Sequence, residues 1–302
     1  LVLITVWSDA MARHLFTGAG LLDYTGKKKH RFLFDYYNAM IGPGFGVTLS
    51  SLFAFSVRPY DDSRYALVEE ISGITLYTNF PWNKGEYMSS EHRLQIKLAY
   101  NERQVQLLKQ TENKMDFILS EDSLRFYHPE SVNEGVITLG YNWLNRRPHK
   151  YNQMLPKQGY GISISADHAN SNILGDMDYT RLSTDAFINY SIGLGVFYGR
   201  VKTAGMEGAP AIQNVLAITN DVPIYLPTIN LLNRDEVINP RGWEGSRLGN
   251  RLVFSTLEYR MGSKNFSVAF ISDIANSWFV GNDLEDWSKI NEYWLDNGEI
   301  EE

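Results

Sequence analysis

Few residues in this chain have the types and spacing that catalysis or metal binding requires. Its six histidines are scattered singly, without the H-E-x-x-H or other paired spacing that holds zinc. They are His14, His30, His92, His128, His149 and His168. The chain also has no cysteine, which excludes a thiol nucleophile, a disulfide scaffold and Cys-ligated zinc or iron–sulfur sites. We therefore expect the histidines to be ordinary polar residues.

Three short segments come near known motifs but lack residues that the chemistry needs. Residues 42–46 read Gly-Pro-Gly-Phe-Gly without the Lys-Ser/Thr that follows a phosphate loop, so we expect a hairpin turn there. Gly245-Ser246 lacks the G-x-S-x-G spacing of a hydrolase nucleophile. Asp167, Asp176 and Asp178 lie close together, but their spacing fits no EF-hand. We expect no enzyme activity, no cofactor and no metal site.

One further segment combines a cation, a glycine and an aromatic residue after a long polar stretch. Residues 239–245 read Asn-Pro-Arg-Gly-Trp-Glu-Gly. Two candidate strands follow, of which the first carries Glu258 and the second Asp273. From the residues alone, an exposed loop followed by strands with ordinary rim charges is the simpler interpretation.

The elements that would position these residues are β-strands, because apolar and polar residues alternate in one segment after another. In residues 93–100 the even positions hold Leu, Ile, Leu and Tyr, while the odd positions hold Arg, Gln, Lys and Ala. The same pattern recurs over 45–56, 136–143, 159–167, 180–192 and 266–273. No comparable helical pattern precedes the acidic end of the chain. The sequence therefore predicts an all-β fold.

The number and length of these segments favour the wall of a barrel. There are roughly twelve candidate strands, many of about 10 residues or more, against ~5 to 6 for a typical soluble strand. A tilted strand that crosses a bilayer needs ~9 to 11 residues. Tight turns at 25–27, 42–44 and 192–194 contrast with long polar stretches at 58–72, 102–133 and 204–249, which we expect to be loops. Short turns on one rim and long loops on the other are typical of outer-membrane barrels.

Alternation alone does not decide which face of the strands meets water. In a soluble sandwich the apolar face is the core, whereas in a membrane barrel it meets lipid and the polar face lines the lumen. Two features favour the barrel: the polar faces are rich in Gly, Ser and Thr, and aromatic residues gather near strand ends, as in an interfacial girdle. These aromatic residues are Tyr24, Tyr36, Tyr37, Tyr100, Tyr141, Trp143 and Trp278. A soluble all-β binding module remains an alternative.

Charge and hydropathy refine this picture. The mean hydropathy is −0.28, and no apolar stretch approaches the ~18 residues of a transmembrane helix. The formal charge of −7 over 302 residues is concentrated in residues 283–302, which hold eight acids and only Lys289 as a base. We therefore expect a barrel over residues 1–282, present only in part, and an acidic tail, insertion or loop over 283–302. The chain opens on Leu1 without a secretory signal, so we expect a fragment.

The ordered series Arg241-Gly242-Trp243, Glu258 and Asp273 resembles the C-terminal barrel of the bacterial surface antigen superfamily. That superfamily comprises the BamA- and TamA-like outer-membrane assembly proteins and the transporters of two-partner secretion. Further segments are similar to a branch in which the barrel follows a TolB-like propeller. These are Arg13-His14, Asp35-Tyr36-Tyr37-Asn38 before 42–44, and Gly175-Asp176-Met177-Asp178-Tyr179. The resemblance covers about residues 10–280.

The resemblance implies an antiparallel transmembrane barrel of sixteen strands, of which about twelve are present here. It also implies that the long loop folds back into the lumen, where Arg241 docks on Glu258 and Asp273, with Gly242 turning the backbone and Trp243 filling space. Asp273 shares its face with small residues, as a lumenal position should. Glu258 instead shares its face with Leu252 and Phe254, so we expect a bulge or a hydrophobic loop contact there.

The function that the resemblance implies is the insertion, assembly or translocation of proteins at the bacterial outer membrane, without enzymatic chemistry. The expected partners are outer-membrane lipids, unfolded client outer-membrane proteins and periplasmic or lipoprotein accessory subunits, with no nucleic acid. A passive porin or receptor barrel is a second hypothesis, in which the polar stretches 102–133 and 204–249 would set permeability. The soluble binding module is the third.

Overall fold

The computed structural model describes most of the chain as β-strand. The described residues are 2–9, 11, 13–21, 31–40, 42–60, 63–83, 90–111, 114–117, 131–146, 158–172, 174–211, 214–219, 224–226, 237–242, 246–262 and 267–280. Within these ranges, no helix is long and apolar enough to cross a membrane. The acidic segment 283–302 and Trp243 lie outside the described residues.

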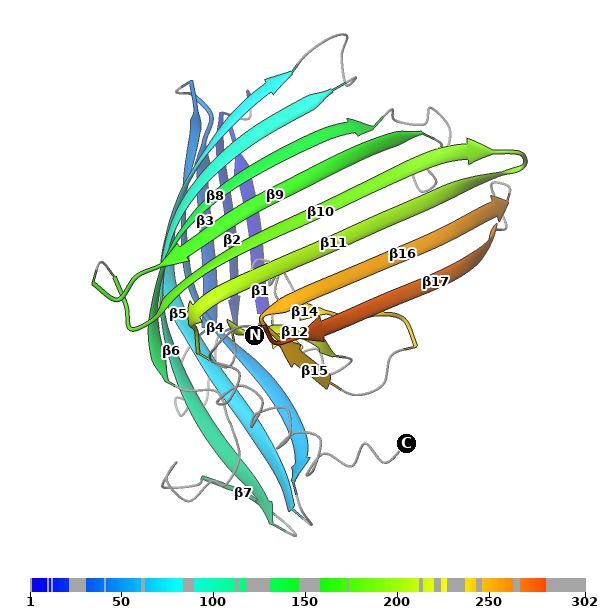
Figure 1. Ribbon diagram of the computed structural model, residues 1–302. Helices are drawn as coiled ribbons and strands as arrows, with labels where there is room; N and C mark the ends of the chain where they lie inside the picture. The colour runs from blue at the N-terminus through cyan, green and yellow to red at the C-terminus, as the bar shows by residue number, and fades with distance from the viewer. Residues whose placement is uncertain are drawn as a thin grey trace.

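Twelve consecutive antiparallel strands form one strongly curved sheet (Figure 1). They are β1 (Val2–Ser8), β2 (His14–Leu21), β3 (Arg31–Asn38), β4 (Gly44–Tyr60), β5 (Ser63–Asn83), β6 (Glu91–Thr111), β8 (Val132–Arg146), β9 (Gly159–Ala169), β10 (Asp178–Ile192), β11 (Gly195–Ala209), β16 (Arg251–Gly262) and β17 (Ser267–Trp278). Each pairs with the next, and the described residues show no pairing between β1 and β17. The predicted all-β antiparallel barrel wall is thus confirmed.

Five short strands lie off this path. Two of them extend the large sheet, β7 (Lys114–Phe117) on β6 and β13 (Ile224–Leu226) on β4. The other three form a separate small sheet in the order β14 (Val237–Ile238), β12 (Leu216–Thr219) and β15 (Ser246–Gly249). β12 to β15 all belong to the connection between β11 and β16, so the predicted loop 204–249 contains strands of its own, and it begins later than predicted because β11 continues to Ala209.

The connections alternate between two rims, because successive strands run in opposite directions. Rim A carries the connections 9–13, 39–43, 84–90, 147–158, 193–194 and 263–266. Rim B carries 22–30, 61–62, 112–131, 170–177 and 210–250. The longest connection, 210–250, lies on rim B and the two-residue turn 193–194 on rim A, as predicted. Rim B also carries the two-residue connection 61–62, and the predicted turn at 25–27, outside the described residues, belongs to the rim-B connection 22–30, so the asymmetry is only partial.

The predicted loop at 58–72 is wrong, and the loop at 102–133 is shorter than predicted. Residues 58–72 belong to the β4–β5 hairpin, in which only 61–62 lie between the strands, and β6 continues to Thr111. β4, β5 and β6 have 17, 21 and 21 residues, well above the ~9 to 11 that cross a bilayer, so they project beyond rim B (Figure 1). A strand that projects beyond the membrane can carry many polar residues. Its composition then resembles that of a loop, which explains the wrong prediction.

The two faces of the sheet have an inverted distribution of polarity. On β10, Leu182 and Tyr190 point outward and are 56% and 57% exposed, whereas Arg181 on the inner face is buried. The same contrast holds elsewhere, with Phe34, Leu49, Leu76, Leu98 and Leu139 exposed on the outside, and Glu134, Thr138, Asp167 and Lys202 buried on the inside. A soluble sandwich buries its apolar face, so this distribution identifies the outer face as the one that meets lipid.

Aromatic residues form a belt on the outer face near rim A. His92 stacks between Trp82 and Trp143, with ring centroids 5.4 and 5.8 Å away, and its Nδ1 lies 2.9 Å from the Tyr141 hydroxyl. Such amphipathic rings suit the boundary between lipid and water. His92 therefore belongs to this interfacial belt.

The apolar core lies inside the curved sheet, where the small sheet packs against the wall. Leu216 and Ile218 of β12 are fully buried and cluster with Ile238 of β14. Leu252 and Phe254 of β16 belong to the same cluster. The pairing of β16 with both neighbours is continuous, so a hydrophobic loop contact rather than a bulge accounts for these two residues on the face of Glu258.

Candidate functional site

The long rim-B connection returns to the inner wall through Arg241, which follows β14. Its Nε and Nη2 donate to the two carboxylate oxygens of Asp273 at 2.8 and 2.7 Å. Its Nη1 donates to Glu258 Oε1 at 2.7 Å, and Nη2 also donates to Thr256 Oγ1 at 2.6 Å. The backbone N–H of Arg241 donates to Asp273 Oδ2 at 3.0 Å. We call Arg241, Thr256, Glu258 and Asp273 the clasp.

Two neighbouring strands position the wall side of the clasp. Thr256 on β16 lies opposite Asp273 on β17, and its hydroxyl donates to that carboxylate. Glu258 lies two residues further along the same face of β16, so alternation alone brings the three side chains together. Val253 and Leu257, of opposite parity on β16, are exposed on the outer face. The clasp therefore lies on the lumenal side of the wall.

The clasp joins a half-exposed cation to two nearly buried anions. The Arg241 side chain is 47% exposed, whereas those of Glu258 and Asp273 are 6% and 4% exposed. The hydrogen bonds of Arg241 to Asp273, and to a smaller extent that to Glu258, raise the pKa of Arg241 above its ordinary value, so the guanidinium remains charged. Bidentate pairing with a carboxylate fixes orientation as well as charge.

Arg260 is a second cation on Glu258, and the sequence analysis did not single it out. Its Nε donates to Glu258 Oε2 at 2.6 Å, and its guanidinium lies 5.0 Å from the centre of the Tyr198 ring. Glu258 thus binds one arginine of the loop and one of its own strand. The i, i+2 spacing of Glu258 and Arg260 was the available signal, because residues two apart on a strand share a face.

The structure thus brings together three of the five residues predicted for this site, Arg241, Glu258 and Asp273. Gly242 follows Arg241 directly and has a φ of 74°, in the left-handed region that glycine adopts without strain. Nothing lies within 4 Å of where a Cβ would be, so conformation rather than space favours glycine. The predicted role of Trp243 stays a prediction.

Ion pairs join neighbouring strands on the inner wall. Arg181 Nε donates to Asp167 at 2.9 Å, and Arg200 Nε donates to Asp185 at 2.9 Å. The wall encloses a hollow of about 550 Å³, whose lining includes Asp35, Tyr77, Lys97 and both partners of the Arg181 pair. Because each of these arginines is compensated by a carboxylate, the lumen shows no strong excess of one charge along these pairs.

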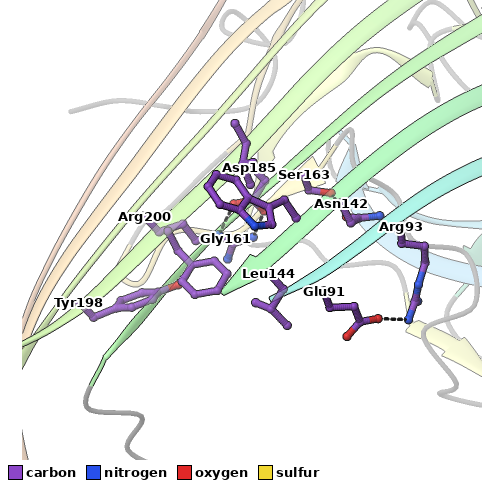
Figure 2. A pocket seen from close by; sticks show the side chains of 12 residues that line it. Glu91, Arg93, Asn142, Leu144, Gly161, Ser163, Asp185, Tyr198 and Arg200 are labelled. Atoms are coloured by element: carbon purple, nitrogen blue, oxygen red, sulfur yellow. Dashed lines mark hydrogen bonds and ion pairs between the residues drawn. The ribbon is translucent and has the colours of Figure 1, made fainter. Parts of the chain in front are cut away.

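A smaller hollow of about 400 Å³ lies on the inner wall toward rim A (Figure 2). Figure 2 shows the ion pairs of Arg93 with Glu91 and of Arg200 with Asp185 along its lining. Gly161 leaves room beneath the Phe187 ring, which a Cβ there would meet at 2.6 Å. This hollow contains no nucleophile paired with a base. Among the described residues, no three His, Asp or Glu side chains are grouped to hold a metal ion.

Comparisons with known proteins show which solved fold the chain shares. No family model and no curated protein sequence matches the chain. Among solved structures, the chain is similar to the crystal structure of BamA from Haemophilus ducreyi lacking POTRA domains 1-3, with a TM-score of 0.56 and 12% sequence identity. The match covers 95% of this chain and 56% of that one, so this chain spans little more than half the length of its structural neighbour. At this identity the likeness shows a shared fold, the β-barrel.

Proposed function

We propose that this chain is the barrel of a protein of the bacterial surface antigen superfamily that helps to insert, assemble or translocate proteins at the outer membrane, without enzymatic chemistry. The observation that carries the proposal is the clasp. A long rim-B loop folds back along the inner wall, and its Arg241 binds one acidic residue on each of the next two strands, Glu258 and Asp273. The barrel fold shared with BamA supports the same proposal at low sequence identity.

The proposed mechanism is strand pairing. The resemblance implies a seam between the first and last strands of the complete barrel, and a strand edge at such a seam accepts a further strand through its backbone groups. A client strand would add to such an edge while the clasp holds the loop and the wall next to β17 in place. No side chain needs to change covalently in this process.

The proposed membrane location and partners follow from the polarity of the two faces of the sheet. The exposed apolar outer face and its aromatic belt suit the outer membrane and its lipids. Unfolded outer-membrane proteins are the proposed clients, with periplasmic or lipoprotein accessory subunits as further partners. We propose no cofactor, no metal and no nucleic-acid partner.

A passive porin or receptor barrel is the second candidate, and the polar hollow of about 550 Å³ favours it. The two functions separate in one experiment with Arg241→Ala in the whole protein. The assembly function predicts that the variant lowers the amount of folded outer-membrane proteins in cells that depend on it. Normal levels of those proteins, together with an altered conductance of reconstituted liposomes, would instead support the porin.

Arg93→Ala is the matched control for that experiment. Arg93 also belongs to an inner-wall ion pair, with Glu91, but both side chains are about half exposed, and in the described part of the loop no hydrogen bond or ion pair reaches either of them. The assembly function therefore predicts that this variant sustains normal levels of outer-membrane proteins. An equal loss in both variants would show that general barrel damage, not the clasp, explains the result.

A further inference from the structure

The rim-B loop touches the wall at a second place, well before Arg241 in the sequence. Asn214 Nδ2 donates to Glu134 Oε1 on β8 at 2.6 Å, and the two residues are only 1% and 4% exposed. β8 lies several strands away from β16 and β17, which carry the clasp. The loop is therefore held at two separate parts of the wall.

Glu134 gathers donors from three elements. Arg103 of β6 donates from Nη2 to Glu134 Oε2 at 2.6 Å, and the Tyr179 hydroxyl of β10 donates to Oε1 at 2.9 Å. Asn214 then adds its amide to the same Oε1. A buried carboxylate needs such partners, because an unpaired charge there would be costly. Arg103 and Tyr179 of the wall thus compensate the Glu134 carboxylate, and its Oε1 accepts one further hydrogen bond from the loop.

The β9–β10 connection closes over this contact. Gly175 bridges to Glu134, and Asp176 exchanges hydrogen bonds with Asn133, with N–H···O distances of 2.8 and 2.9 Å. Gly175 has a φ of 99°, and a Cβ there would meet Asn133 O at 2.6 Å, so only glycine fits the crossing. This crossing brings the Met177 sulfur to 3.2 Å from the Ala211 N–H and 3.7 Å from Asn214 Nδ2.

Apolar packing continues from the polar contact. Ala211 before it, and Leu216 and Ile218 after it, are buried in one cluster with Val136 and Met206 of the wall. The beginning of the loop is therefore enclosed, in contrast to Arg241, whose side chain is 47% exposed. The segment 175–179, noted from the sequence for its resemblance and for its aspartates, supplies part of this enclosure.

We propose that Arg103, Glu134, Met177, Tyr179 and Asn214 form a seat that fixes the start of the rim-B loop to the wall independently of the clasp. The clasp is then a contact that can open while the seat and the small sheet stay in place. Glu134 and Asn214 are positioning residues in this arrangement. The inference concerns the loop alone and does not depend on the proposed assembly function.

The test uses the absence of cysteine from the chain. Ala211→Cys places one thiol beside Met177 of the seat, where Ala211 is 7% exposed, and its reaction rate with a polar maleimide reports opening of the seat in the folded barrel. Asn172→Cys, in the exposed turn beside the seat, is the accessible reference. Each variant is first shown to migrate as a compact, heat-modifiable barrel.

Asn214→Asp and Asn214→Ala are the variants that should open the seat. The first sets a second carboxylate against Glu134, and the second removes the donor of the loop. We expect Ala211→Cys to react about tenfold faster or more in either background, and fastest with Asn214→Asp. Gln95→Ala is the matched control, because it removes a wall amide outside the seat that donates to Asn79 Oδ1 at 3.1 Å, and we expect a rate within about twofold of the parent.

Arg241→Ala tests independence. We expect Ala211→Cys to stay as protected as in the parent when the clasp is removed. The inference is overturned if Arg241→Ala exposes the thiol as much as Asn214→Asp does, because the loop would then dock as one unit. It is also overturned if neither Asn214 variant changes the rate in a folded barrel.

Discussion

Asp273 accepts three hydrogen bonds from Arg241, two from its guanidinium and one from its backbone N–H. A side-chain pair alone would tolerate some shift of the loop, but the backbone bond fixes the position of the chain itself. Asp273 therefore sets both the charge and the register of the loop against β17.

Arg241→Ala should destabilise the barrel by about 1–3 kcal/mol, because it leaves the nearly buried Asp273 without its cation and Glu258 with Arg260 alone, while Arg241 itself is half exposed. Arg241→Lys should recover only part of this loss, since an ammonium cannot make the bidentate contact. The measurement is the temperature at which the compact band on a gel converts to the unfolded one. A Lys variant as stable as the parent would show that charge alone matters.

The clasp should also show energetic coupling between its two sides. Once Arg241 is alanine, Asp273→Asn should cost much less than it costs in the parent, because its main partner is already gone. Contacting residues of this kind typically couple by ~0.5–3 kcal/mol. The four proteins of the cycle are compared by the same gel transition. Strict additivity would mean that the two side chains do not interact in the membrane.

Gly242→Ala should destabilise the loop by about 1 kcal/mol through its backbone conformation, since φ is 74° and no atom blocks a Cβ. Gly242→Asn should be milder, because asparagine tolerates the left-handed region better than alanine. Gly140→Ala on β8 is the control, as its nearest Cβ contact is an ordinary 3.7 Å. Equal effects at both glycines would contradict this explanation.

The strands could be predicted from the sequence because each one repeats its face pattern over many residues. The same period placed Asp273 on the lumenal face, and the order of Arg241, Glu258 and Asp273 led to the residues that meet in the clasp. Thr256 and Arg260 lie within two residues of Glu258 on one face of β16, so strand parity could have added them.

The seat could not be predicted in the same way. Asn214 and Glu134 are single polar residues far apart in sequence, and nothing in their neighbourhoods marks them as partners. Their meeting depends on how the β9–β10 connection crosses β8 and on how β12 folds back, and neither has a periodic signal. The length of β4 to β6 was missed for a related reason, since polar strands beyond the membrane have the composition of loops.

Leu76 and Thr75 test the membrane fold itself, because these neighbours on β5 point to opposite faces. Leu76 is 45% exposed on the outer face, whereas Thr75 lines the lumenal hollow. Leu76→Arg should reduce folding into lipid vesicles by ~2–4 kcal/mol if it lies near the bilayer midplane, since it places a cation in hydrocarbon. Thr75→Arg should fold nearly as well as the parent, because its charge enters a polar lumen, and should change conductance instead. A soluble sandwich would bury Leu76 in its core and would penalise Leu76→Arg as well, but the protein would be recovered without detergent and Thr75→Arg would change no conductance. Conductance and the need for detergent therefore decide between lipid and a soluble core on the apolar face, with two variants at neighbouring positions in the chain.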